Sequence, residues 1–316
     1  MISAKNSLRV TLLAMATLIF AACGSDSKPG TGTLSMSVTD APVDEAHAVV
    51  IAMTEFEFKP VDGPSFRVPV IEPGRELNLL AFSNGEAALV IDGEEVPAGD
   101  YEWLRIYFDE AATYVVLEEG GGTYPLFIPS GAQTGFKVVS GFTVPANESV
   151  AYMLDFDLRK SLHSPPGLAG RFGEDRVFLL RPTVRILNMA ETGGVWGVVA
   201  DGLLAMNNDE ASCAGGDAVY AFEGLDVDPR GEGVLPLVSD IVELNETEGW
   251  HEYQLAYLLP GDYTLAFTCS ASADDGEPET YPLDDLLFSE VINVTVIEEQ
   301  HKRCDIPPAA GQADPC

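Results

Sequence analysis

Short apolar runs that alternate with polar residues fill the chain from residue 31 onward, and Gly, Pro, Asn and Asp separate them. Residues 33–39 (TLSMSVT) alternate cleanly, and residues 48–58 begin as an apolar run and end in strict alternation. A period of two places the apolar side chains on one face of a strand. Further strands are expected over residues 101–108, 114–117, 124–128, 150–156 and 177–187. Short strands between turns predict an all-β chain that forms a sandwich or barrel rather than a βαβ sheet.

Helical spacing is confined to two short stretches, residues 75–82 and 284–288. Apolar residues make up 46% of the chain, which supplies enough material for packed cores and argues against disorder. At 316 residues, two domains are the natural expectation.

The first 22 residues have the pattern of an export signal: two positive residues, an uncharged apolar run over residues 10–20, and two alanines before Cys23. The run is shorter than the roughly 20 residues that span a bilayer. A cysteine at this point resembles a bacterial lipobox, with Phe20 in the place where Leu is usual. The alternative is an ordinary signal peptide followed by a coincidental cysteine.

A lipid on Cys23 implies anchoring in a membrane, because two or more acyl chains hold a protein stably. Gly24 rather than Asp after the cysteine resembles the sorting signal for the outer membrane. Residues 25–32 (SDSKPGTG) look like a flexible tether. The prediction is a cell-envelope protein that contacts the membrane through its anchor, on a face that the sequence leaves open.

The charge is strongly negative, with 17 basic and 50 acidic residues. Lys5 and Arg9 belong to the signal, so the mature chain has 15 basic and 50 acidic residues and a net charge of −35. This excludes nucleic acid as a partner and disfavours anionic lipid head groups. Two explanations stay open: solubility in a salty medium, and binding of divalent cations.

The predicted organisation has a boundary at residues 188–194 (NMAETGG). Each side repeats part of the other: residues 96–101 (VPAGDY) and 259–263 (LPGDY) both enter a strand through a Pro–Gly turn. The expected parts are a signal peptide (1–22), the lipidated cysteine and tether (23–32), a β-sandwich (33–188), a smaller β-sandwich (193–300) and a disulfide-closed tail (301–316).

Four cysteines remain besides Cys23, which suits an oxidising compartment. We expect Cys213 to pair with Cys269, and Cys304 with Cys316, although other connectivities stay open. A zinc site is less favoured, because the chain has no C-x-x-C and no histidine placed to complete a ligand set.

Several segments, in order, resemble bacterial lipoproteins that contain the domain of unknown function 4382, over about residues 31–188. The resemblance implies an exported β-sandwich of uncharacterised activity and supplies no catalytic residues. Beyond Gly193 a looser likeness is to prealbumin-like or carboxypeptidase-regulatory-like sandwiches. The matching segments are residues 32–42 (GTLSMSVTDAP), 96–108 (VPAGDYEWLRIYF), 124–137 (YPLFIPSGAQTGFK), 154–161 (LDFDLRKS) and 180–185 (LRPTVR).

Asp155 and Asp157 are the most prominent pair of carboxylates, because alternate residues of a strand share a face. They are candidates for a calcium site or an acid/base pair. The structural alternative is an ion pair with Arg159, Arg181 or Arg185.

The three tryptophans, Trp103, Trp196 and Trp250, are expected in the cores, with stacking on sugars as the alternative. No H-E-x-x-H or G-x-S-x-G motif occurs. The sequence therefore predicts a non-catalytic binding, adhesion or structural module without a cofactor, whose partner is an envelope or extracellular protein or a glycan. The alternatives are a calcium-dependent module and a carboxylate-dependent glycan hydrolase.

Overall fold

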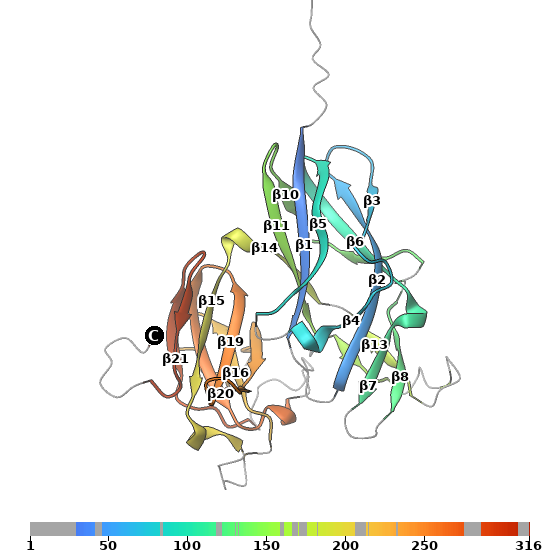
Figure 1. The fold of residues 1–316 in the computed structure, drawn as a ribbon. Coiled ribbons are helices and arrows are strands. Elements are labelled where there is room, and N and C mark those ends of the chain that lie inside the picture. Colours follow the sequence, from blue (N-terminus) through green and yellow to red (C-terminus); the bar gives the residue numbers. More distant parts are fainter. Residues whose placement is uncertain are drawn as a thin grey trace, which may run out of the picture.

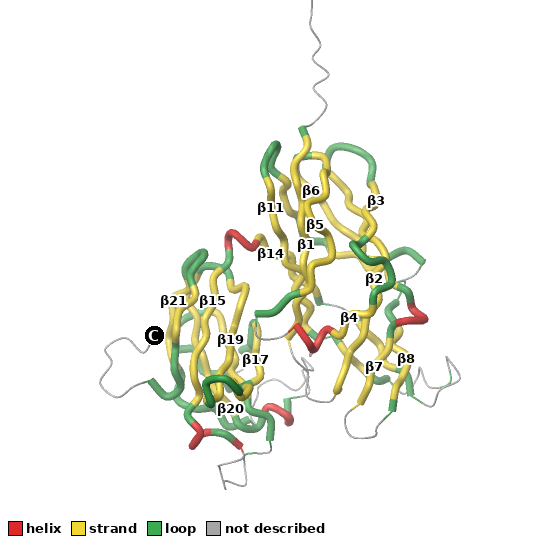
Figure 2. Tube along the Cα trace, in the orientation of Figure 1, coloured by secondary structure: helices red, strands yellow, loops and turns green. Residues whose placement is uncertain are grey.

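The protein is all-β in a computed structural model, as predicted, and Figure 2 shows strands with a few short helical turns. The helices described are 3-10 turns of three or four residues, far below the length needed to cross a bilayer. The structure describes residues 30–41, 46–82, 85–117, 122–129, 131, 133–158, 161–165, 170, 176–181, 183–205, 213, 215–231, 233–274, 286–308 and 316. Of Asp40, Ala41 and Asp157 it describes the backbone only.

The first sandwich packs a 4-stranded sheet, in the order β14-β11-β1-β5, against a 10-stranded sheet (Figure 1). The larger sheet runs β10-β6-β2-β7-β8-β13-β12, with β3 and β4 also paired to β2, and β9 to β6. The elements are β1 (Thr31–Ala41), β2 (Ala46–Pro60), β3 (Phe66–Pro69), β4 (Glu76–Asn78), η1 (Leu79–Phe82), β5 (Ala88–Pro97), β6 (Gly99–Phe108), η2 (Glu110–Ala112), β7 (Tyr114–Leu117), β8 (Thr123–Phe127), β9 (Phe136–Val138), β10 (Phe142–Val144), β11 (Ser149–Asp157), β12 (Leu162–His163), β13 (Phe178–Leu180) and β14 (Val184–Asn188).

Alternation along β1 and β2 produces the first core. Leu34, Met36 and Val38 point inward from β1 and are fully buried, and they pack in one cluster with Phe56 and Phe58 of β2. Each such side chain contributes roughly 1.5–3 kcal/mol when removed from water, so this face fixes the register of both strands.

The second sandwich follows a short turn, η4 (Met189–Glu191), and contains two 4-stranded sheets in the orders β18-β19-β15-β22 and β17-β16-β20-β21 (Figure 1). Residues of both sheets meet in one core. The elements are β15 (Gly193–Val199), η5 (Asp201–Leu203), β16 (Ala218–Glu223), β17 (Val238–Ile241), β18 (Glu243–Asn245), β19 (Trp250–Leu258), β20 (Gly261–Thr268), η7 (Ala271–Ala273), β21 (Ile292–Val296) and β22 (His301–Arg303).

Seven strands of the first sandwich have a counterpart in the second. In each, the first strand pairs antiparallel with one neighbour and parallel with the last strand of the set. The second strand pairs with the strand that follows it and with the strand entered through the Pro–Gly turn. The counterparts are β1 and β15, β2 and β16, β3 and β17, β5 and β19, β6 and β20, β10 and β21, and β11 and β22.

Two expected elements differ from the structure. The run 177–187 is two strands in different sheets, β13 and β14, because the N–H groups of Arg181 and Thr183 donate to Ser161 instead of a neighbouring strand. The helical stretch at 75–82 is strand β4 followed by the 3-10 turn η1, since residues 76–78 pair with β2. Of 284–288, residues 286–288 are not helical, and the rest lies outside the described residues.

Candidate functional site

The lipidation candidate Cys23 lies outside the described residues, so lipid attachment stays a prediction. The other four cysteines form the disulfides Cys213–Cys269 and Cys304–Cys316, which are the expected pairs.

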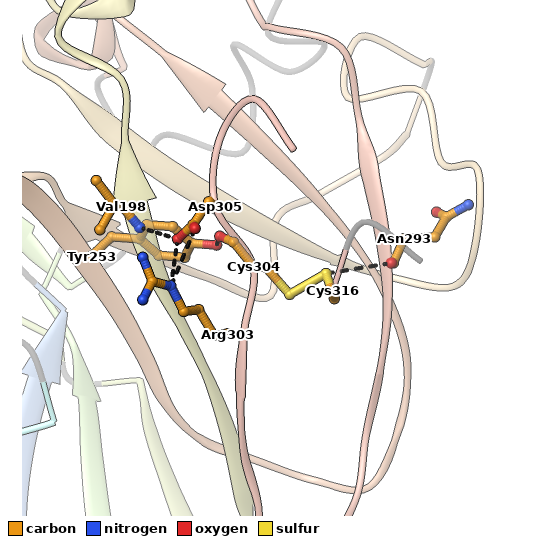
Figure 3. The surroundings of a disulfide bond; sticks show 7 residues. All are labelled: Val198, Tyr253, Asn293, Arg303, Cys304, Asp305 and Cys316. Atoms are coloured by element: carbon orange, nitrogen blue, oxygen red, sulfur yellow. Dashed lines mark hydrogen bonds and ion pairs between the residues drawn. A yellow bond between two sulfur atoms is a disulfide. The ribbon is translucent and has the colours of Figure 1, made fainter. Parts of the chain in front are cut away.

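Figure 3 shows the second disulfide at the end of the chain. Tyr253, buried in the core, donates its hydroxyl to the carbonyl of Cys304 at 2.7 Å, and the Sγ of Cys316 lies 3.7 Å from the carbonyl oxygen of Asn293. Cys304 follows β22 in one sheet and Asn293 belongs to β21 in the other. The disulfide therefore holds Cys316 beside the edge strands of both sheets.

The Asp155 carboxylate is buried and paired with Arg185, its cross-strand partner on β14. The Nε of Arg185 donates to Oδ2 of Asp155 at 2.9 Å, and its Nη2 donates to the same oxygen. For Asp155 the structure therefore shows the ion pair that was expected as the alternative to a calcium site or an acid/base pair. The side chain of Asp157 and all of Arg159 lie outside the described residues. In the described ranges, no three His, Cys, Asp or Glu side chains are grouped so that they could hold a metal ion.

The expectation of buried tryptophans is wrong, since all three are half-buried on outer sheet faces. Their polar neighbours give the physical reason. Trp196 lies under the guanidinium of Arg303, 4.9 Å from the ring centre, and the indole N–H of Trp250 donates to Glu252 at 2.8 Å. Such rings combine an apolar body with a polar edge and are stable at a water-facing surface.

A hollow of about 600 Å³ lies on the outer face of the sheet β18-β19-β15-β22. Trp196 and its cross-strand neighbour Gln254 point away from the core between inward-facing residues, so strand alternation places them on this face. We call this hollow the groove. It is lined by Glu86, Trp196, Glu243, Leu244, Asn245, Glu252, Tyr253, Gln254 and His301.

Glu252 is the most firmly positioned carboxylate of the groove. Its two oxygens accept hydrogen bonds from Nδ2 of Asn245 and Nε1 of Trp250, both at 2.8 Å. Glu243 stands directly opposite Glu252 on β18, so two acidic side chains are cross-strand neighbours. Like charges at such a position repel, which makes this face favourable for ligands that donate hydrogen bonds.

One wall of the groove comes from the first sandwich. The segment at Gly85 and Glu86 is held by Thr39 of β1, whose hydroxyl oxygen lies 2.8 Å from the carbonyl of Glu86, and by Tyr257 of β19, whose hydroxyl donates to the carbonyl of Gly85 at 2.9 Å. Gly85 has a left-handed backbone, with φ of 77°, which glycine adopts without strain, and a Cβ there would lie 2.5 Å from Nε2 of Gln254.

Tyr257 itself has a left-handed backbone, with φ of 55°, near the end of β19. Burial, reinforced by the negative charge of Asp155, raises its pKa, so the hydroxyl stays protonated and donates at neutral pH. Asp155 therefore lies beside the contact between the sandwiches and serves the architecture there.

The groove combines one aromatic face with carboxylate and amide side chains, which is the chemistry that recognises a polyhydroxylated ligand. The sequence indicated Trp196 as a ring that sugars can stack on, but it did not indicate Glu86, Gln254 or His301. In the sequence, only the alternation around Trp196 and Gln254 indicated which side chains share this face. No local pattern groups the lining residues as a whole, because they come from segments that are far apart in the chain.

No curated protein matches the chain. The solved structures with some likeness include a leucine-rich repeat protein from Bacteroides thetaiotaomicron (12% identity, 88% of this chain and 26% of that one, TM-score 0.20). Others are the Bacillus anthracis TIE protein (12%, 87% and 34%, TM-score 0.19) and a putative cell adhesion protein from Bacteroides fragilis (10%, 88% and 91%, TM-score 0.22).

The chain spans about a quarter to a third of the length of the first two structures. At these identities and TM-scores, the likeness carries no argument about ligand or activity. A family model with the description "Domain of unknown function (DUF4382)" matches residues 31–182. This domain is therefore found in the first sandwich, where the sequence resemblance placed it.

Proposed function

We propose that the protein is a lipid-anchored, non-catalytic module of the cell envelope that binds a neutral oligosaccharide in the groove. The export signal and Cys23 support the anchor. The observation that carries the ligand is the half-buried ring of Trp196 in a hollow of about 600 Å³ lined by carboxylates and amides. Sugar rings present an apolar face that stacks on an indole, and their hydroxyl groups donate to carboxylates.

Binding of neutral hexasaccharides tests the ligand. The mature chain with Cys23→Ser would be titrated calorimetrically with cellohexaose, maltohexaose and chitohexaose. We expect at least one to bind, and Trp196→Ala to weaken it at least tenfold, as for a central aromatic contact. Trp103→Ala, which removes a half-buried tryptophan from the other sandwich, is the matched control and leaves the affinity unchanged. Equal affinity of Trp196→Ala and the parent would refute the groove as the site.

The anchor has its own test. The natural precursor should incorporate labelled palmitate and partition with membranes, whereas Cys23→Ser should do neither. Retention of the palmitate label on the variant would contradict lipidation of Cys23, and it would leave the proposal for the groove unaffected.

A glycan hydrolase is the second candidate, because Glu243 and Glu252 are adjacent carboxylates beside an aromatic ring. Paired cross-strand positions bring side chains within the roughly 5 Å that retaining glycosidases use. Both oxygens of Glu252 already accept hydrogen bonds from within the protein, which suits a fixed acceptor and favours binding. Shortened sugars in the titration mixtures, absent with Glu243→Gln, would establish the hydrolase instead.

Calcium dependence is tested on the same sample. Under the proposal, millimolar calcium leaves both the melting temperature and the saccharide affinity unchanged. A ligand of the folded state must raise the melting temperature, so a clear rise would favour the calcium-dependent alternative.

A further inference from the structure

A second surface, independent of the groove, lies on the outer face of β3, β2, β6 and β9. One row of paired residues crosses these four strands: Arg67 opposite Glu57, Glu57 opposite Arg105, and Arg105 opposite Lys137. Neighbouring strands are about 4.8 Å apart, so the row spans roughly 14 Å of open sheet.

The two ends of this row differ in charge. Arg67 forms an ion pair with Glu55 and lies 3.8 Å from the carboxylate of Glu57, so that end is neutralised. At the other end, Arg105 and Lys137 make no ion pair with any described residue. Both cations instead lie over the ring of one tryptophan.

That ring belongs to Trp103, which is half-buried two residues before Arg105 on β6. The guanidinium carbon of Arg105 is 5.1 Å from the ring centre, and Nζ of Lys137 is 4.9 Å from it. Val139, directly after β9, is 75% exposed. We call Trp103, Arg105 and Lys137 the cationic strip.

The second sandwich shows that the fold does not require such a strip. Given the counterpart strands and their registers, the position of Arg105 corresponds to Ala266 on β20. Ala266 is fully buried and packs with Tyr220, Leu286 and other apolar residues on that face. The same sheet face is thus covered in one sandwich and open, aromatic and positively charged in the other.

The strip is exceptional in a chain with a net charge of −33. At physiological ionic strength the Debye length is about 8 Å, so acidic residues farther away than that are largely screened. Arg105 donates a hydrogen bond to the carbonyl of Thr134. A polyanion that approaches this face therefore meets two cations that form no ion pair with a described residue, whereas most of the protein repels it.

We infer that the cationic strip binds an acidic polysaccharide, with carboxylates on Arg105 and Lys137 and a sugar ring packed against Trp103. Trp103 and Arg105 are half-buried and Lys137 is exposed, so an extended polymer can reach all three from solvent. A uronic acid unit carries a carboxylate on a rigid ring with an apolar face, which matches a tryptophan flanked by cations. An acidic polypeptide presents the charge without that ring, so it matches only half of the strip.

The test uses the mature chain with Cys23→Ser and polygalacturonate, measured by calorimetry at low and high salt. We expect binding that weakens with salt, a loss of about tenfold for Lys137→Gln, and about a hundredfold for Arg105→Gln/Lys137→Gln, since a charge-assisted hydrogen bond is worth about a factor of ten. Fully methyl-esterified polygalacturonate has the same backbone without charge and should show no binding that depends on Arg105 and Lys137.

Matched variants separate this site from net charge and from the groove. Arg75→Gln/Arg230→Gln removes the same charge from exposed positions elsewhere and should bind like the parent, with equal melting temperatures verifying the folding of both variants. Trp103→Ala should weaken polygalacturonate binding, and Trp196→Ala should not. Undetectable binding, unchanged affinity of Arg105→Gln/Lys137→Gln, or equal binding of the methyl ester would overturn the inference. Poly-glutamate binding with the same dependence on both cations would reassign the strip to an acidic protein.

Discussion

The two sandwiches tie down their first strands with the same hydrogen bonds. The N–H of Asn147 donates to the carbonyl of Thr31, and the N–H of Glu299 donates to the carbonyl of Thr192, both at 2.8 Å. Both donors have left-handed backbones, with φ of 60° and 56°. The Pro–Gly turns agree as well, because an aspartate after each turn accepts from a threonine hydroxyl across the sheet, Asp100 from Thr143 and Asp262 from Thr295.

The outer faces do not agree. In the first sandwich the face of β2 and β6 is open and carries Glu57 and Arg105, whereas in the second the same positions are Tyr220 and Ala266, buried under loops. The aromatic groove lies on the other sheet of the second sandwich, at Trp196. The order and pairing of the strands therefore depend on the inward faces, which must fit one another, while the outward faces are free to specialise.

The largest expected contrast comes from the disulfides, which occur in the second sandwich. Cys213→Ser/Cys269→Ser opens a link with a sequence separation of 56, which should lower the free energy of unfolding of that sandwich by about 4 kcal/mol. The first sandwich should be unaffected. Calorimetry should show one melting transition moving and one staying. Equal movement of both would mean that the sandwiches unfold as one unit.

Gly32 and Gly193, near the start of the first strand of each sandwich, should destabilise their sandwiches equally when substituted. A Cβ on Gly32 would lie 2.2 Å from the carbonyl oxygen of Pro145, and one on Gly193 would lie 2.3 Å from that of Ile297. Gly32→Ala and Gly193→Ala should each destabilise their own sandwich by about 2–3 kcal/mol. Gly202→Ala, with open space around it, is the control and should be neutral. A large effect of one and none of the other would break the equivalence.

Smaller and equal effects are expected at the two tyrosines that follow the Pro–Gly turns. The hydroxyl of Tyr101 donates to the carbonyl of Pro97 at 2.6 Å, and that of Tyr263 to the carbonyl of Leu259 at 2.8 Å. Burial raises the pKa of Tyr101 to about 12, which keeps this donor protonated. Each Tyr→Phe change should cost about 1 kcal/mol in urea unfolding. Costs that differ more than twofold would show that the corners are not equivalent.

The smallest effects on stability are expected at two carboxylates, Glu57 and Asp217, whose pKa values are shifted in opposite directions. Replacing them should change the free energy of unfolding at pH 7 with opposite signs. A hydrogen bond from Ser65 lowers the pKa of Glu57, so this group adds stability above the unfolded pKa near 4.5, which is lost as the pH falls through the folded value. Glu57→Gln should therefore cost a few tenths of a kcal/mol at pH 7 and less near pH 4.

Burial raises the pKa of Asp217, against the hydrogen bond from the backbone of Ala205, so its ionisation opposes folding at neutral pH. Asp217→Asn should leave that hydrogen bond and stabilise the second sandwich slightly at pH 7, with the gain fading toward pH 3.8. Chemical unfolding between pH 3.5 and 7 measures both variants. The same sign for both would contradict the assigned environments.

Much of the architecture was predictable from local pattern. Alternation placed β1, β2, β6 and β11 within a few residues, because burial of one face fixes a period of two. The turn sequence before Tyr101 and its repeat before Tyr263 indicated related sandwiches, and the even set of cysteines indicated two disulfides. These features depend on neighbours in the chain or on residue counts.

Which outward faces are covered, and which residues come together on them, depends on the tertiary structure. Periodicity shows that Trp103 and Trp196 share a face with their alternate residues, but it is silent on whether another layer covers that face. Asp155 pairs with Arg185 because β11 and β14 are adjacent in the sheet. The groove needed Glu86 of one sandwich and Trp196 of the other to line the same hollow, and these residues are more than a hundred positions apart, which no local pattern in the sequence encodes.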